Sequence, residues 1–168
     1  MIKSALSRSV SSATFIVGIS FYFLPFGVSG QAEKETKMKD LSFMIGDWVG
    51  TSTTYEKGEV KEQVPAFQKI SFDLDSNIIV IELHSELLQL HTIIYYDEKE
   101  EQYSYNPYSR SGARQLTAEL VDGRFVVNAS ETKRFIFGRT EKGFREYGEK
   151  LVDGKWEKYF EDNFVSTD

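Results

Sequence analysis

Two histidines are the first residues in this chain that could do chemistry. His84 and His91 are the only histidines, and there is no cysteine. If the strands on either side of Leu87-Leu88 form a tight hairpin, the two imidazoles face each other and could share a metal ion, with Glu82 as a third ligand on the same face. Two histidines alone do not make a site, however, and Leu-Leu is poor turn chemistry. The sequence therefore favours histidines that face solvent or line a wall, and it predicts no metal ion.

The segment 73–77, Asp-Leu-Asp-Ser-Asn, resembles the start of a calcium-binding loop. Such a loop needs a glycine at its sixth position and a bidentate glutamate at its twelfth. These positions hold Ile78 and His84. An ordinary hairpin turn explains the segment better than a calcium site.

Signatures of catalysis are absent from the sequence. There is no nucleophile elbow, no phosphate-binding loop and no evident pair of carboxylates. We predict no catalytic residue and no cofactor. An unrecognised enzyme stays an alternative, because catalytic residues can be far apart in a sequence.

Aromatic residues and arginines give the more informative set. Tyrosine has a large apolar face and a polar tip, and an arginine that points into a barrel usually meets a ligand carboxylate or an internal acid. Two interpretations stay open: these side chains line a cavity for a small apolar or amphipathic molecule, or they fill a barrel and coat its outside. The candidate ligand-binding residues are Trp48, Phe72, Tyr95, Tyr103, Tyr105, Arg114, Phe125, Arg134, Phe135, Arg145 and Trp156.

Short β-branched or aromatic segments, separated by turn residues, must position these side chains. Asp122-Gly123 and Asp153-Gly154 are the strongest turn signals, since an Asp-Gly pair accepts the positive backbone angles of a tight hairpin. Pro65 should precede a strand, because proline cannot donate to a ladder. The expected strands cover residues 47–55, 66–74, 78–86, 90–97, 102–106, 113–120, 124–129, 133–139, 144–151 and 155–165.

All the predicted connections are short, so each strand should pair antiparallel with the next. Closing the sheet on itself would remove its two exposed edges. We therefore predict an all-β fold, an up-and-down antiparallel barrel of about ten strands. One short N-terminal helical turn, 41–45, should precede it, because its apolar residues have the spacing of a single helical face.

The stretch Met44-Ile45-Gly46-Asp47-Trp48-Val49-Gly50 carries a resemblance to a known family. Leu41 to Gly50, Tyr96-Asp97 and Gly154-Lys155-Trp156 resemble motifs of the calycin superfamily, and most closely those of a group of exported bacterial calycin-like domains. The likeness implies a ten-stranded, nitrobindin-like barrel. Trp48 lies on the opposite strand face from Asp47 and Val49, so we expect it to point inward and seal the floor. Nitrobindins hold haem through a histidine near the C-terminus. No histidine follows His91, so haem is not expected here.

The N-terminal residues are predicted to be a targeting signal. Residues 1–30 have a positive start at Lys3 and Arg8, an apolar run and small residues before the expected cleavage after Gly30 or Ala32, as in a signal peptide. Residues 31–40 have no apolar period and read as a flexible leader, and residues 41–168 form the barrel domain. The expected localisation is periplasmic or extracellular, with no stable membrane span once the signal is removed.

Net charge limits the partners. The chain carries −6, and removal of the two signal-peptide cations takes this to −8, which repels nucleic acid. We expect a monomer or dimer that binds a small hydrophobic or amphipathic molecule without altering it. A surface module that holds a glycan or a protein through exposed tyrosines is an alternative.

Overall fold

The computed structural model describes residues 28–167, with side chains from Ala32 onward. The predicted signal peptide therefore falls almost wholly outside the described residues. The elements are α1 (Val28–Lys39), a 3-10 turn (Ser42–Met44), β1 (Gly46–Glu56), β2 (Glu59–Asp73), β3 (Ile78–Ser85), β4 (Gln89–Asp97), β5 (Gln102–Ser109), β6 (Gly112–Ala113), β7 (Leu116–Val121), β8 (Arg124–Ser130), β9 (Lys133–Arg139), β10 (Gly143–Val152) and β11 (Lys155–Ser166).

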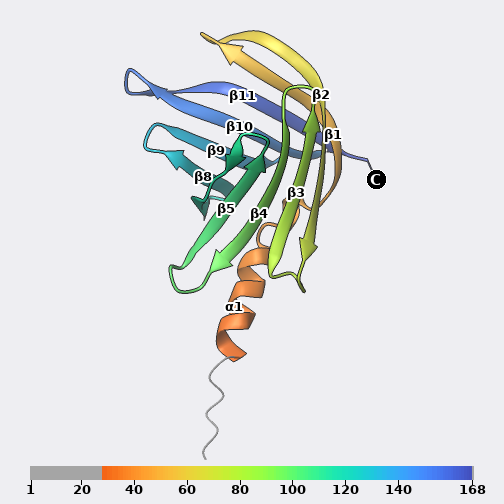
Figure 1. The fold of residues 1–168 in the computed structure, drawn as a ribbon, viewed down its shortest axis with the longest axis vertical. Helices are drawn as coiled ribbons and strands as arrows, with labels where there is room; N and C mark the ends of the chain where they lie inside the picture. Colours follow the sequence, from red (N-terminus) through yellow and green to blue (C-terminus); the bar gives the residue numbers. More distant parts are fainter. Residues whose placement is uncertain (1–27, 168) are drawn as a thin grey trace, which may run out of the picture.

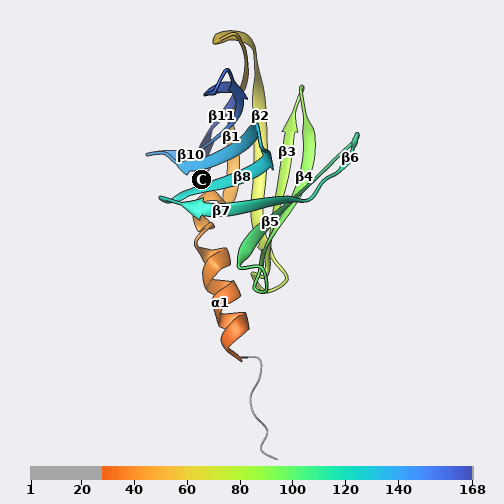
Figure 2. The ribbon, with the colours of Figure 1, turned by 90° about the vertical axis from the view of Figure 1, so that its left-hand side faces the viewer.

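Ten of these strands form a closed barrel (Figures 1 and 2). Each pairs antiparallel with its sequence neighbour, β5 pairs directly with β7, and β11 returns to pair with β1. The two-residue β6 is an addition to the end of β5. The predicted fold, an all-β up-and-down barrel of about ten strands with a short N-terminal helical turn, is confirmed.

Turn chemistry explains where the chain reverses. Asp122-Gly123 and Asp153-Gly154 both have positive φ at each residue, as does Lys57-Gly58. Two consecutive positive φ angles give the hairpin turn whose twist matches that of the flanking strands. The hairpin turns predicted at the two Asp-Gly pairs are therefore confirmed.

The second strand starts earlier than predicted. β2 begins at Glu59 and contains Pro65, which pairs with Thr51 of β1. β3 joins β2 only from Ala66 onward. Pro65 thus lies where β2 has a ladder on one side only, so the N–H that proline lacks is not missed.

Alternation along the strands sends every second side chain into the barrel. The half of the interior nearest α1 is filled by aromatic rings in edge-to-face and tilted contact. This packed layer contains Trp48, Tyr103, Phe125, Phe137, Phe144 and Phe164, all buried.

A plug closes this end of the barrel. Figures 1 and 2 show α1 running up to it from below, and Met38, Leu41 and Met44 are fully buried there. The Trp48 indole donates to the Met44 carbonyl at 2.7 Å, and the Tyr103 hydroxyl donates to the Lys37 carbonyl at 2.7 Å. Trp48 therefore seals the floor as expected.

The segment predicted as a flexible leader, residues 31–40, lies almost entirely in helix α1. Its polar residues show no helical apolar period, which is why the sequence does not predict this helix. Met38 anchors the last turn of the helix in the core, and Lys39 and Glu35 form an ion pair one turn apart at 2.6 Å.

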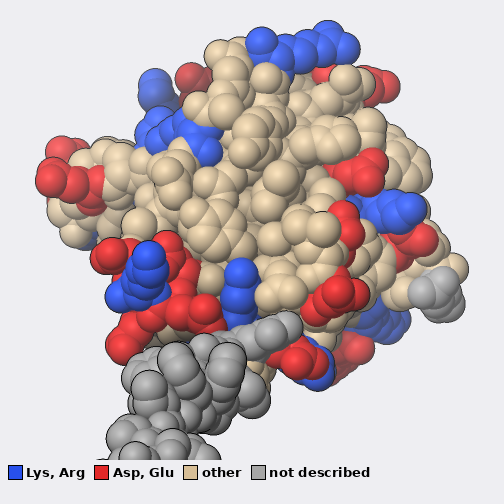
Figure 3. Space-filling model, turned by 60° about the horizontal axis from the view of Figure 1, so that its bottom comes forward, with Lys and Arg blue, Asp and Glu red and all other residues tan. Residues whose placement is uncertain are grey.

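Surface properties agree with the charge argument. α1, with twelve residues that are mostly polar, does not have the length or apolar character needed to span a membrane, and nor does any other helix among residues 28–167. In the face drawn in Figure 3, basic side chains are interspersed with acidic ones and form no continuous stripe.

Replacing Trp48 should test the plug. Trp48→Ala is expected to lower the free energy of unfolding by about 3–5 kcal/mol, because a large buried ring is lost and its cavity cannot fully collapse. Trp156, the other tryptophan, is 39% exposed, and Trp156→Ala should cost less than about 1 kcal/mol. Urea unfolding followed by far-ultraviolet circular dichroism measures both variants. Equal losses in the two would show that Trp48 does not seal the core.

Candidate functional site

The half of the barrel away from α1 contains an open cavity of about 510 Å³. Its rim is formed by the β3–β4 hairpin and by the loop and short strand that follow β5. Its volume is in the range of pockets that hold small organic molecules, about 300–1,000 Å³. The barrel interior is thus packed at one end and hollow at the other.

Apolar side chains line most of the cavity wall. They include Leu83, Leu90, Leu116 and Phe135 from four different strands. At the mouth, Leu87 and Leu88 on the β3–β4 turn are 40% and 44% exposed. Leucines left in water beside an apolar hollow favour a ligand that covers them.

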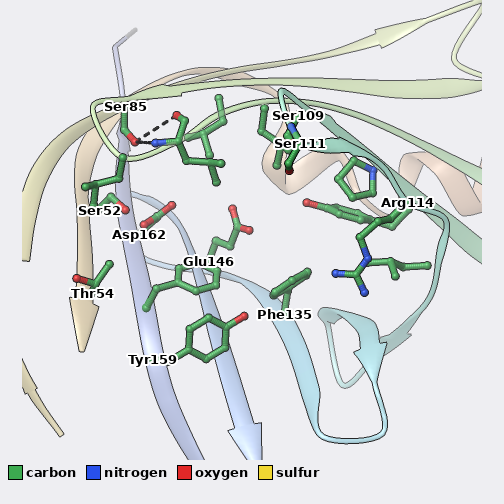
Figure 4. A pocket seen from close by; sticks show the side chains of 18 of the residues that line it. Ser52, Thr54, Ser85, Ser109, Ser111, Arg114, Phe135, Glu146, Tyr159 and Asp162 are labelled. Atoms are coloured by element: carbon green, nitrogen blue, oxygen red, sulfur yellow. Dashed lines mark hydrogen bonds between the residues drawn. The ribbon is translucent and has the colours of Figure 1, made fainter. Parts of the chain in front are cut away.

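Two carboxyl groups lie side by side in the wall. Glu146 of β10 and Asp162 of β11 are direct partners across the ladder, and both are buried and line the cavity. Figure 4 shows both side chains pointing into it, with Arg114 on the far side. Gln68 donates to Glu146 Oε2 at 3.1 Å.

Burial changes the acidity of this pair. Loss of solvent, and then the nearby Asp162, raise the pKa of Glu146 to about 8, although the hydrogen bond from Gln68 acts to lower it. Burial also raises the pKa of Asp162 to about 6. The two carboxyls titrate as a pair. Near neutral pH they hold one proton between them, so the site can both donate and accept a hydrogen bond.

Unpaired acceptors accompany the carboxyls. Among the described residues, Gln68 Oε1 and Asp162 Oδ1 are buried oxygens without a hydrogen-bond partner. A buried acceptor without a donor costs about 1–3 kcal/mol. Asp162 lines the cavity, so a bound molecule with an N–H or O–H group would recover that energy at Asp162 Oδ1.

A bulge shapes the wall beside the carboxyls. The register of β10 and β11 shifts between Gly148 and Glu149, so that Tyr159 and Phe160 are both cavity-lining. A Cβ atom at position 148 would lie 2.2 Å from Phe160 Cε1 and 2.7 Å from Tyr159 Cζ. Only glycine fits there. Burial, followed by the charge of Glu146, raises the pKa of Tyr159 to about 12, so its hydroxyl keeps its proton.

Of the residues predicted to bind a ligand, three line this cavity: Tyr105, Arg114 and Phe135. Tyr105 is fully buried, and that burial raises the pKa of its hydroxyl. Arg114 donates to the Ala129 carbonyl at 2.8 Å, which fixes its guanidinium at the rim.

The other predicted residues lie elsewhere. Trp48, Tyr103 and Phe125 belong to the packed layer at the opposite end, and Phe72 packs against that core. The remaining four have outward positions in the strand alternation: Tyr95, Arg134, Arg145 and Trp156.

Outward arginines have partners of their own. Arg134 forms an ion pair with Glu149 at 2.6 Å and stacks on the Trp156 ring at 4.3 Å. Arg145 lies over the Tyr147 ring at 5.0 Å. These side chains coat the barrel and do not reach the cavity.

Sequence reasoning missed Glu146 and Asp162. They come from two strands, so no single motif contains both. A signal was present in the alternation: Glu146 is two residues from the apolar Phe144, and Asp162 lies between Phe160 and Phe164. An acid in register with buried aromatics is predicted to face inward.

Stability should therefore depend on pH through Glu146. The unfolded side chain loses its proton near its ordinary pKa of 4.5, while the folded one holds it to about pH 8. The favourable contribution is complete below pH 4.5 and is lost as the pH rises to 8. Glu146→Gln should remove a decline on the order of 5 kcal/mol, because a pKa difference of one is worth about 1.4 kcal/mol.

Chemical denaturation at a series of pH values measures that slope. Glu119→Gln is the matched control, because Glu119 is an exposed residue of β7. It should keep the wild-type decline. Parallel curves for the wild type and Glu146→Gln would contradict the assigned acidity.

Comparisons with known proteins add no assignment. No family model matches the chain, and no curated protein matches it significantly. The geometry of the cavity is therefore the basis on which a function can be inferred.

Proposed function

We propose that the protein is an exported binding protein that holds one small amphipathic molecule in the open half of its barrel. The observation that carries the proposal is the cavity of about 510 Å³, which combines a leucine-rich mouth with two buried carboxyl groups. The export rests on the positive start, apolar run and small residues of the first thirty residues.

The wall chemistry supports an apolar body for the ligand. Leu83, Leu90, Leu116 and Phe135 offer no hydrogen bonds, and burial of apolar surface is worth roughly 25 cal/mol per Å². The exposed Leu87 and Leu88 at the mouth extend this surface toward solvent.

The carboxyl pair supports a head group that donates hydrogen bonds, such as an amine or a hydroxyl. Asp162 Oδ1, on a residue that lines the cavity, has no hydrogen-bond donor. A ligand carboxylate placed against Glu146 and Asp162 would meet like charge and lose its hydration. Arg114 lies across the cavity from the carboxyls and does not neutralise them (Figure 4).

Membership of the calycin superfamily is part of the same proposal. The ten-stranded closed barrel and the inward Trp48 against a helical plug support it. Calycins use the interior of the barrel for ligands, as proposed here. Haem held in the nitrobindin manner is not part of the proposal, because no histidine follows His91.

A matched series of ten-carbon ligands tests the head-group preference. Decylamine and decanol should bind and raise the melting temperature, whereas decanoate should not. Glu146→Gln should weaken decylamine by about tenfold, since a charge-assisted hydrogen bond is lost, and should leave decanol less affected. Glu119→Gln should leave both unchanged. Isothermal titration calorimetry at pH 8.5 gives the affinities.

Obstruction of the mouth tests the location. Ala113 is exposed and lines the cavity, so Ala113→Trp should block entry without disturbing the core. Thr117→Trp, on the exposed face of β7, is its control. Decylamine binding that survives Ala113→Trp and Glu146→Gln undiminished would refute a site in the barrel.

One observation favours a second candidate function, acid–base catalysis on the bound molecule. Glu146 and Asp162 have pKa values pushed apart, to about 8 and about 6, so at neutral pH one can donate a proton while the other accepts. Mass spectrometry of molecules extracted from the protein in its own host distinguishes the two functions. A bound molecule recovered with the same mass and the same chromatographic retention after prolonged incubation supports binding; one converted by the wild type but not by Glu146→Gln supports catalysis.

A further inference from the structure

We propose that the outer face of the β3–β4 hairpin is a binding site for a divalent transition-metal ion, held by Glu82, His84 and His91. This site lies outside the barrel and is independent of the function proposed for the cavity. Each of the three side chains offers one ligand atom, and these atoms all lie within 4.8 Å of one another.

Strand register brings the three residues together. Glu82 pairs directly with His91, and His84 is two residues further along β3. Ile81 and Leu83 on the same strand are buried in the barrel, so Glu82 and His84 face outward between them. Three ligands on a paired hairpin have fixed backbone positions, which lowers the entropy lost on binding.

The present distances suit a site that closes by small side-chain movements. Zinc binds imidazole nitrogen at about 2.0–2.1 Å and carboxylate oxygen at about 2.0–2.2 Å, so tetrahedral ligand atoms lie about 3.4 Å apart. The imidazole rings are 6.5 Å apart between centroids and inclined at 79°. Both histidines are exposed and Glu82 is half-buried, so rotation of the side chains can supply the remaining approach.

The donor set selects the class of metal. Two imidazoles and one carboxylate favour Zn²⁺, Cu²⁺, Ni²⁺ or Co²⁺, whereas Mg²⁺ and Ca²⁺ prefer oxygen ligands alone. Three protein ligands on an open surface leave a coordination position for water or for a group from another molecule.

The surroundings determine how strongly the site competes. Lys69 pairs in register with Glu82, which places a cation on the strand next to that carboxylate. Phe67 lies opposite His84 and Tyr108 opposite His91, and they are 54% and 46% exposed. These rings are the cross-strand neighbours of the two histidines.

Zinc titration of tag-free protein tests the proposal without ambiguity, because the chain contains no other histidine and no cysteine. One equivalent of ZnCl₂ should bind in calorimetry at pH 7.5. MgCl₂ should not compete.

Single substitutions assign the ligands. His84→Gln and His91→Gln should each weaken zinc by more than about 100-fold, because even outer-shell partners typically contribute 10–100-fold. Glu82→Gln should weaken it by about tenfold or more. Gln89→Ala, in register with His84 but outside the ligand set, is the control and should bind as the wild type does.

All three ligand positions are on the surface, and circular dichroism should show unchanged folding in each variant. Nitrogen-15 spectra should show both imidazoles shifting together as one equivalent of zinc is added. Failure of the wild type to bind zinc saturably would overturn the proposal, and so would zinc binding that survives in His91→Gln.

Discussion

The width of a ten-stranded barrel constrains everything else in this molecule. Side chains just fill an eight-stranded barrel, so two further strands leave a space that the chain must occupy or leave open. At one end, the fully buried Met38, Leu41 and Met44 form a plug against a layer of aromatic rings. At the other end no such plug exists within the described residues, and the cavity of about 510 Å³ results. The plugged end and the cavity therefore both follow from the extra interior space that ten strands enclose.

The open half carries a cost that the packed half does not. Buried carboxyls next to each other are destabilising once both are charged, and Glu146 and Asp162 are direct ladder partners. Apolar residues at these two positions would make the fold more stable. This destabilising pair lies in the wall of the cavity, close to Gly148, whose missing side chain leaves room for the rings of Tyr159 and Phe160. Adjacent buried carboxyls and unpaired polar atoms that concentrate at one place are characteristic of a functional site.

The sequence predicted the barrel well because its evidence is local. Asp122-Gly123 and Asp153-Gly154 fix turns through their own backbone preferences, and alternation assigns faces strand by strand. The residues of the site were harder to predict, because they are distinguished by how far along the barrel axis each inward side chain lies. Trp48 and Phe135 both face inward, yet one lies in the packed layer and the other lines the cavity. Helix α1 was not predicted for a related reason: Met38 is buried through tertiary contacts, and the helix has no apolar period of its own. The alternation of side chains along a strand does not indicate where the packed layer ends and the cavity begins.

The same period of two places different chemistry on the two sides of one hairpin. In β3, Leu83 lines the cavity while its neighbours Glu82 and His84 face solvent. The turn that joins β3 to β4 holds Leu87 and Leu88 at the mouth, and Ser85 fixes it through a hydrogen bond from the Leu88 N–H to its hydroxyl at 3.0 Å. An ion that bridges β3 and β4 on the outside would restrain the strands that carry this rim. Leu83 lies between the two metal ligands of β3 and lines the cavity, so β3 joins the two sites directly, and by linkage any coupling would act equally in both directions.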